Sequence, residues 1–165
     1  MRHVAVAWLG LGANLDRPAD QIRRAVDELA RHPDLRVLAL SALYRTAPVG
    51  GPAGQPDFCN ACLACATECD PYTLLEIAHA IERAHHRTRD ERWGPRTLDI
   101  DLLAFDDRRL DCPRLSLPHP RAHERAFVLR PLADIAPALV LGSAGRVTDL
   151  LAGLNTDDIR PWAQR

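Results

Sequence analysis

The feature that most constrains the fold is the order of strand-like and helix-like patterns along the first two thirds of the chain. Four segments are β-branched, apolar or alternating, as is typical of strands: residues 3–12, 35–46, 57–67 and 97–105. Residues 18–32 carry apolar side chains at helical spacing with Asp16 available as a cap, and Asp70-Pro71 opens a second helix. The order strand, helix, two strands, helix, strand predicts a ferredoxin-like α+β sandwich with helices on one face of an antiparallel sheet. Short, broken helices are expected in the C-terminal third.

Size and charge limit the kinds of partner. The chain of 165 residues is long enough for one sizeable core, and we expect residues 1–165 to form a single domain. The formal net charge of −1 excludes a domain-wide basic field of the kind that captures nucleic acid or an anionic membrane. No apolar run reaches the roughly 18 residues of a membrane span, and no cleavage site follows the short N-terminal apolar patch. We therefore expect a cytoplasmic protein whose partners are small molecules.

Four of the five cysteines stand at positions 59, 62, 65 and 69, a spacing like that of the iron-sulfur run of bacterial ferredoxins. If residues 57–67 form a strand, Cys59 and Cys65 point to one face of the sheet and Cys62 to the other. The four thiols then could not converge on one cluster, and cysteine is a common small core residue. Packing is the favoured interpretation, with an electron carrier or a zinc site as the alternative.

Asp99 and Asp101 lie two apart on a predicted strand, so both carboxylates project from the same face. An acid pair without a neighbouring lysine suits a divalent cation, and carboxylates with open water positions suit magnesium. The polar loop 85–96 just before them contains four arginines, at positions 87, 89, 92 and 96, and all 21 basic residues of the chain are arginine. Arginines beside metal-binding acids are typical of a polyphosphate site. The alternative is a solvated acidic strand next to a solvated loop.

Two other functions fit the same residues. A nucleotidyltransferase can also use an acid pair with two metals, but it releases pyrophosphate. A non-catalytic binding module is possible on this fold, because ferredoxin-like sandwiches host many functions. An RNA-binding module of this kind would need exposed aromatic residues in a basic field, and aromatic residues make up only 5% of the chain.

The segment RWGPRTLDIDLL, residues 92–103, resembles the hallmark motif of the 6-hydroxymethyl-7,8-dihydropterin pyrophosphokinase family. Further resemblance covers most of the chain, in the segments LGLGANL (9–15), YRTAPVG (44–50), QPDFCN (55–60), LLEIAHAIER (74–83) and LPHPRAHERAFVLRPLADIAP (117–137). The resemblance implies an enzyme of folate biosynthesis that transfers the diphosphate of ATP to a pterin hydroxymethyl group and releases AMP. It also implies a monomer with two Mg²⁺ ions at each site.

Carried over to matching positions, the resemblance assigns roles to individual residues. Asp99 and Asp101 would bind the metal ions, and with Arg87 and Arg96 would be the catalytic set. The pterin would be held by Thr46, Val49, Phe58, Asn60 and Phe127, with the two phenylalanine rings stacking on it. The ATP site would comprise His79, Glu82, Arg87, Arg89, Trp93, Arg96, Leu102, Arg114, Ser116, His119 and Arg125.

Overall fold

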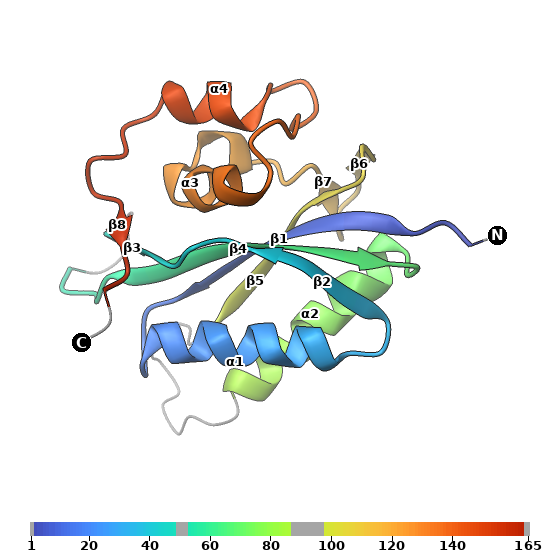
Figure 1. Cartoon of the computed structure of the whole chain (residues 1–165), viewed down its shortest axis with the longest axis horizontal. Helices are drawn as coiled ribbons and strands as arrows, with labels where there is room; N and C mark the ends of the chain where they lie inside the picture. Colours follow the sequence, from blue (N-terminus) through green and yellow to red (C-terminus); the bar gives the residue numbers. More distant parts are fainter. Residues whose placement is uncertain (1, 49–52, 87–97, 164–165) are drawn as a thin grey trace.

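The computed structural model describes residues 2–48, 53–86 and 98–163, and its centre is one antiparallel sheet (Figure 1). The sheet strands are β1 (Ala5–Ala13), β2 (Leu35–Leu40), β3 (Tyr44–Thr46), β4 (Phe58–Thr67), β5 (Asp99–Phe105) and β8 (Arg160–Pro161). The helices are α1 (Pro18–Arg31), α2 (Pro71–His86), the 3₁₀ turn η1 (Ala122–Glu124), α3 (Ala126–Ile135) and α4 (Val147–Ala152). The short strands β6 (Leu110–Asp111) and β7 (Ser116–Leu117) pair with each other.

The strand order is β5-β1-β4-β3-β8, and β2 pairs with the other end of β4. This order is the ferredoxin-like one if β2 and β3 count as a single strand, so the predicted fold class is confirmed. The single strand expected over 35–46 is interrupted, because three residues, Ser41–Leu43, face only two residues of β4 between the pairs Leu40↔Leu63 and Tyr44↔Asn60. An extra residue of this kind is a bulge, which bends a strand and re-aims the residues beyond it.

Helices cover both faces of the sheet, which corrects the expectation of a single helical layer. Figure 1 shows α1 and α2 below the sheet and α3 and α4 above it. The first layer buries Ile22, Leu29 and Leu74 against the sheet, and the second buries Leu129 and Leu132. The strands therefore need apolar side chains on both sides, which explains why nearly all of β4 is buried.

The helix starts differ in how they are capped. Arg17, in the left-handed conformation, is the N-cap of α1 and makes no side-chain capping bond, so the expected role of Asp16 is wrong. Asp70 does cap α2, since its Oδ1 accepts a hydrogen bond of 2.8 Å from the backbone N–H of Thr73. The helix continues to His86, so His85, expected in a polar loop, is instead a buried residue of α2.

The cysteines divide between the faces of β4 as the strand pattern predicts. Cys59 and Cys65 lie in the core between the sheet and the layer of α1 and α2, whereas Cys62 lies in the core between the sheet and α3. Cys69 follows the strand and is only partly buried. Thiols on opposite faces of a sheet cannot share one cluster, so packing accounts for Cys59, Cys62 and Cys65. Within the three described ranges, no helix is long and apolar enough to cross a membrane.

Candidate active site

Two glycines of β1 open a hollow on the α3 side of the sheet. Gly12 pairs with Asn60 of β4 on one side and with Asp99 of β5 on the other. Gly10 lies between Cys62 and Asp101 in the same way. A side chain at Gly12 would force Asn60 to move, since an added Cβ would lie 2.8 Å from Oδ1 of Asn60. The absence of side chains at alternate positions leaves space between two strands that carry polar groups.

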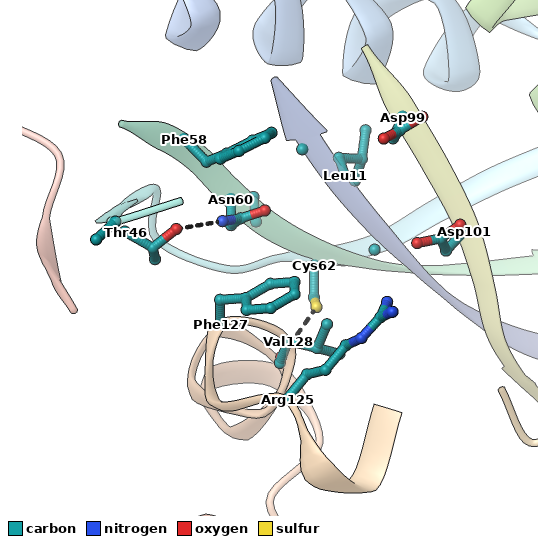
Figure 2. A pocket seen from close by; sticks show the side chains of 14 residues that line it. Leu11, Thr46, Phe58, Asn60, Cys62, Asp99, Asp101, Arg125, Phe127 and Val128 are labelled. Atoms are coloured by element: carbon teal, nitrogen blue, oxygen red, sulfur yellow. Dashed lines mark hydrogen bonds between the residues drawn. The ribbon is translucent and has the colours of Figure 1, made fainter. Parts of the chain in front are cut away.

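This hollow is part of a cavity of about 210 Å³ between the sheet and the start of α3. Figure 2 shows the rings of Phe58 and Phe127 on either side of Asn60. The cavity also exposes Asp99 and Asp101 to the same space. It therefore combines two aromatic faces, a carboxamide and two carboxylates, which suits a flat, polar heterocycle that carries a reacting group toward the acids.

Asn60 is held in place by its neighbour on β3. Its Nδ2 donates a hydrogen bond of 2.7 Å to Oγ1 of Thr46, and both residues are buried. An amide has a second donor hydrogen and an acceptor oxygen. Asn60 can therefore be oriented by Thr46 and still pair with both donors and acceptors at the edge of a ring.

A second cavity of about 230 Å³ lies along the other side of β5. Four residues predicted at the ATP site line it together with Leu102: His79, Arg114, Ser116 and His119. Asp101 lines both cavities. A group bound to Asp101 would therefore lie between a ligand in the first cavity and a ligand in the second.

His119 is oriented by backbone contacts beside Asp101. Its N–H donates to the carbonyl oxygen of Leu103 at 2.8 Å, and its ring Nδ1 accepts from the N–H of Arg121 at 3.2 Å. Burial lowers the pKa of His119, the carboxylate of Asp101 opposes that shift, and Arg125 and Arg121 add to it. With Nδ1 accepting, the neutral ring carries its proton on Nε2, where it can donate to an anionic ligand.

The acid pair fits magnesium better than a metal that needs a closed protein cage. The two carboxylates lie two positions apart on β5, with Gly10 and Gly12 rather than bulky side chains beside them. In the described part of the chain, no group of three or more His, Cys, Asp or Glu residues could hold a metal ion by itself. Magnesium commonly uses one or two carboxylates and completes its coordination with water and substrate phosphates.

Three other predicted site residues make contacts that the sequence did not indicate. Arg125 lines the first cavity rather than the second, with its guanidinium 5.7 Å from the centre of the Phe127 ring. Glu82 accepts a hydrogen bond of 3.3 Å from the N–H of Ile100, so it supports β5 from the α2 side. Leu102 lines the second cavity, but it is only 3% exposed and also belongs to the core. The remaining predicted residues lie outside the described ranges: Val49, Arg87, Arg89, Trp93 and Arg96.

Sequence reasoning missed the wall residues that carry no chemistry of their own. Gly10 and Gly12 create the hollow, and Cys62 and Val128 line it. Glycine at alternate positions of an apolar strand was an available signal, because such glycines often mark a close approach by a ligand. The sequence also did not indicate that Arg114, which lines the second cavity, forms an ion pair with Glu76 of α2.

The chain is similar to known proteins over most of its length. Residues 8–137 match the family model described as 7,8-dihydro-6-hydroxymethylpterin-pyrophosphokinase (HPPK). The 2-amino-4-hydroxy-6-hydroxymethyldihydropteridine pyrophosphokinase of Pseudomonas aeruginosa is 48% identical over 145 residues, which cover 88% of this chain and 89% of the relative. The enzyme of the same name from Bacillus subtilis is 36% identical over 160 residues, covering 97% and 92% of the two chains.

Solved structures agree on the fold. The crystal structure of wild-type Plasmodium falciparum HPPK-DHPS with pterin and p-hydroxybenzoate matches with a TM-score of 0.70 at 16% identity. The match covers 92% of this chain but only 43% of the Plasmodium chain, so this chain spans less than half of that protein. On the strength of the family model and the close relatives, the chain belongs to the 7,8-dihydro-6-hydroxymethylpterin-pyrophosphokinase family.

Proposed function

We propose that the cavity between β4, β5 and α3 binds the pterin, and that the cavity beside α2 and β7 binds the nucleotide. As a member of its family, the chain transfers the diphosphate of ATP to 6-hydroxymethyl-7,8-dihydropterin in folate biosynthesis. The observation that carries the assignment of the two cavities is that Asp101 lines both of them. Diphosphate transfer needs the acceptor and the donor to meet in line, and catalysis of this type consists mainly of positioning and charge stabilisation.

The first cavity has the features that a pterin requires. The ring would lie between Phe58 and Phe127, and its donor and acceptor edge would meet the carboxamide of Asn60. Thr46 fixes which way that carboxamide points, because its hydroxyl oxygen accepts from Nδ2. The hydroxymethyl group would then extend toward Asp99 and Asp101, where the diphosphate is transferred.

The acid pair and the groups around it would handle the charge of ATP. We propose that Asp99 and Asp101 hold two Mg²⁺ ions, which when bound would neutralise phosphate oxygens and favour loss of the hydroxyl proton. The Nε2–H of His119 and the guanidinium of Arg125 lie on the nucleotide and pterin sides of Asp101, respectively, and would donate to phosphate oxygens. In the reaction, the pterin hydroxyl attacks the β-phosphorus of ATP and AMP leaves.

Arginines that precede β5 complete this proposal from the sequence motif. Arg87 and Arg96 would clamp the phosphates, and Arg89 and Trp93 would cover ATP. Guanidinium groups are suited to this role because they form paired, charged hydrogen bonds with phosphate oxygens.

We also propose that residues 1–165 act as one monomeric domain in the cytoplasm. The helices α1, α2 and α3 pack on a single sheet, and α4 packs on α3, which supports one folding unit. The cysteine pattern supports a reducing compartment, since the five cysteines are an odd number and four of them lie between positions 59 and 69.

The test is the nucleotide product formed from ATP, Mg²⁺ and 6-hydroxymethyl-7,8-dihydropterin. We expect AMP to appear only when the pterin is present, and to decrease sharply for Asp101→Asn. Pyrophosphate in place of AMP would instead support a nucleotidyltransferase. AMP formation that Asp101→Asn leaves unchanged would refute the role of Asp101 between the two cavities.

A further inference from the structure

The helix that carries Phe127 into the pterin cavity is fixed to the sheet at its other end. At that end Asp134 reaches the bulge between β2 and β3, where its Oδ2 accepts from the N–H of Ala42 at 3.2 Å and from the hydroxyl of Tyr44 at 2.7 Å. Its other oxygen, Oδ1, accepts from Arg130 at 3.2 Å. One carboxylate thus receives three donors from α3 and from the interrupted strand.

The geometry of α3 connects this contact to the cavity. Phe127 and Asp134 are seven positions apart in one helix, which is about two turns, so they lie on the same side. Phe127 forms one wall of the cavity. Fixing Asp134 therefore fixes both the height and the rotation of the helix face that carries Phe127.

The geometry of β3 connects the same contact to the opposite wall. Tyr44 and Thr46 are two positions apart in a strand, so their side chains share a face. Tyr44 is also the sheet neighbour of Asn60, the residue that Thr46 orients. The carboxylate of Asp134 consequently joins the helix that carries one wall of the pterin cavity to the strand that carries the other.

The environment favours a persistent contact. The side chain of Asp134 is 23% exposed, and Tyr44 is 6% exposed. The guanidinium of Arg130 pairs with Asp134 and also lies 5.1 Å from the centre of the Tyr44 ring. Bonds from neutral donors to a carboxylate are stronger than bonds between neutral groups, and the Tyr44 donor is buried, so this contact can resist movement of α3.

We propose that Asp134 is a positioning residue for the pterin. Without contacting the pterin itself, Asp134 sets the separation between Phe127 and the Thr46–Asn60 pair. The proposal depends on the assignment of the first cavity to the pterin. The proposal predicts an effect on one substrate only. Loss of the Asp134 contact weakens pterin binding, while ATP binding and the rate at saturating pterin change little.

The experiment compares Asp134→Ala, Asp134→Asn and Tyr44→Phe with the unmodified enzyme, measuring KM for each substrate and kcat. For Asp134→Ala we expect the pterin KM to rise about tenfold, with the ATP KM and kcat within about twofold. Asp134→Asn keeps an acceptor oxygen for Ala42 and Tyr44, so it should restore most of the pterin affinity. Tyr44→Phe removes one donor and should give an intermediate rise.

Thr67→Val is the matched control. Its hydroxyl bonds to the carbonyl of Asp34 at 2.9 Å and accepts from the N–H of Cys69 at 3.0 Å, at the end of β4 far from the cavity. This variant should lose comparable stability and leave the pterin KM unchanged. An unchanged pterin KM in Asp134→Ala, or equal changes in Asp134→Ala and Thr67→Val, would overturn the proposal.

Two further outcomes are distinguishable. If Asp134→Ala does not fold, Asp134→Asn and Tyr44→Phe decide the question, and normal pterin KM values in both would refute the positioning role. If the unmodified enzyme forms no AMP in the presence of the pterin, the proposed function itself has failed, and the failure does not come from Asp134.

Discussion

Replacing Gly12 by alanine should disturb pterin binding through Asn60. The added Cβ would lie 2.8 Å from Oδ1 of Asn60, closer than Cβ atoms approach oxygen in folded proteins. Gly12 and Asn60 are paired across neighbouring strands, so the backbone has little freedom to separate. The Asn60 side chain must therefore rotate or shift by a few tenths of an ångström.

The cost can be estimated from the contact that the shift breaks. Asn60 donates to Thr46 at 2.7 Å, and Thr46 is 3% exposed, so its hydroxyl has little access to water as a substitute. Losing a buried hydrogen bond of this kind costs about 1 to 2 kcal/mol. If this cost appears in binding, it corresponds to a rise of about five- to thirtyfold in the pterin KM, since about 1.4 kcal/mol is a factor of ten.

The assay is steady-state AMP formation with each substrate varied in turn, beside unfolding in urea to measure stability. We expect the pterin KM to rise in Gly12→Ala while the ATP KM stays within about twofold. Gly10→Ala is the matched comparison, because the atoms nearest to its Cβ would be Leu103 side-chain carbons at 3.5 Å, an ordinary contact. A pterin KM that rises no more in Gly12→Ala than in Gly10→Ala would show that Asn60 is not the group affected.

Three other predictions concern the acids, a helix cap and alkaline stability. Asp101→Asn should lower kcat by more than about tenfold, because one carboxylate charge facing both cavities is removed, and kcat values over a range of Mg²⁺ concentrations check this. Asp70→Ala should lower the free energy of unfolding in urea by about 1 kcal/mol, because the N–H of Thr73 loses its cap. Burial and the hydrogen bond to Asp134 raise the pKa of Tyr44 to about 12. Burial raises the pKa of Cys65 to about 11. Both groups ionise more readily when unfolded, so stability should be complete below about pH 9 and decline between about pH 9 and 12. Urea midpoints that stay constant over that range would contradict the shifts.

The fold could be predicted from the sequence to the extent that it depends on local periodicity. In the strand formed by residues 58–67, the alternation of side chains predicts that Cys62 faces away from Cys59 and Cys65. The structure places Cys62 on the opposite face of the sheet from the other two. The period of a strand decides this before any packing is known. The interruption at Ser41–Leu43 could not be predicted in the same way, because both halves of that segment read as strand and only pairing with β4 reveals the extra residue.

The candidate site could likewise be predicted from the sequence only where it depends on local patterns. The motif around Asp99 and Asp101 predicted that both carboxylates lie side by side, because residues two apart on a strand share a face. It did not give the cavity that holds them, which depends on glycines of β1 facing residues of β4 and β5. The distribution of Arg125 and His119 between two cavities likewise follows from where separate segments meet.

By itself, then, the sequence determined the α+β fold class, the acid pair and the family, because these depend on short-range periodicity and on motifs of adjacent residues. Tertiary structure alone decided that Asp101 faces two cavities, that a side chain at Gly12 would displace Asn60, and that Asp134 joins α3 to the β2–β3 bulge. Each of these features joins residues far apart in the chain. Such contacts depend on how strands pair and how helices pack, and no local pattern encodes their distances.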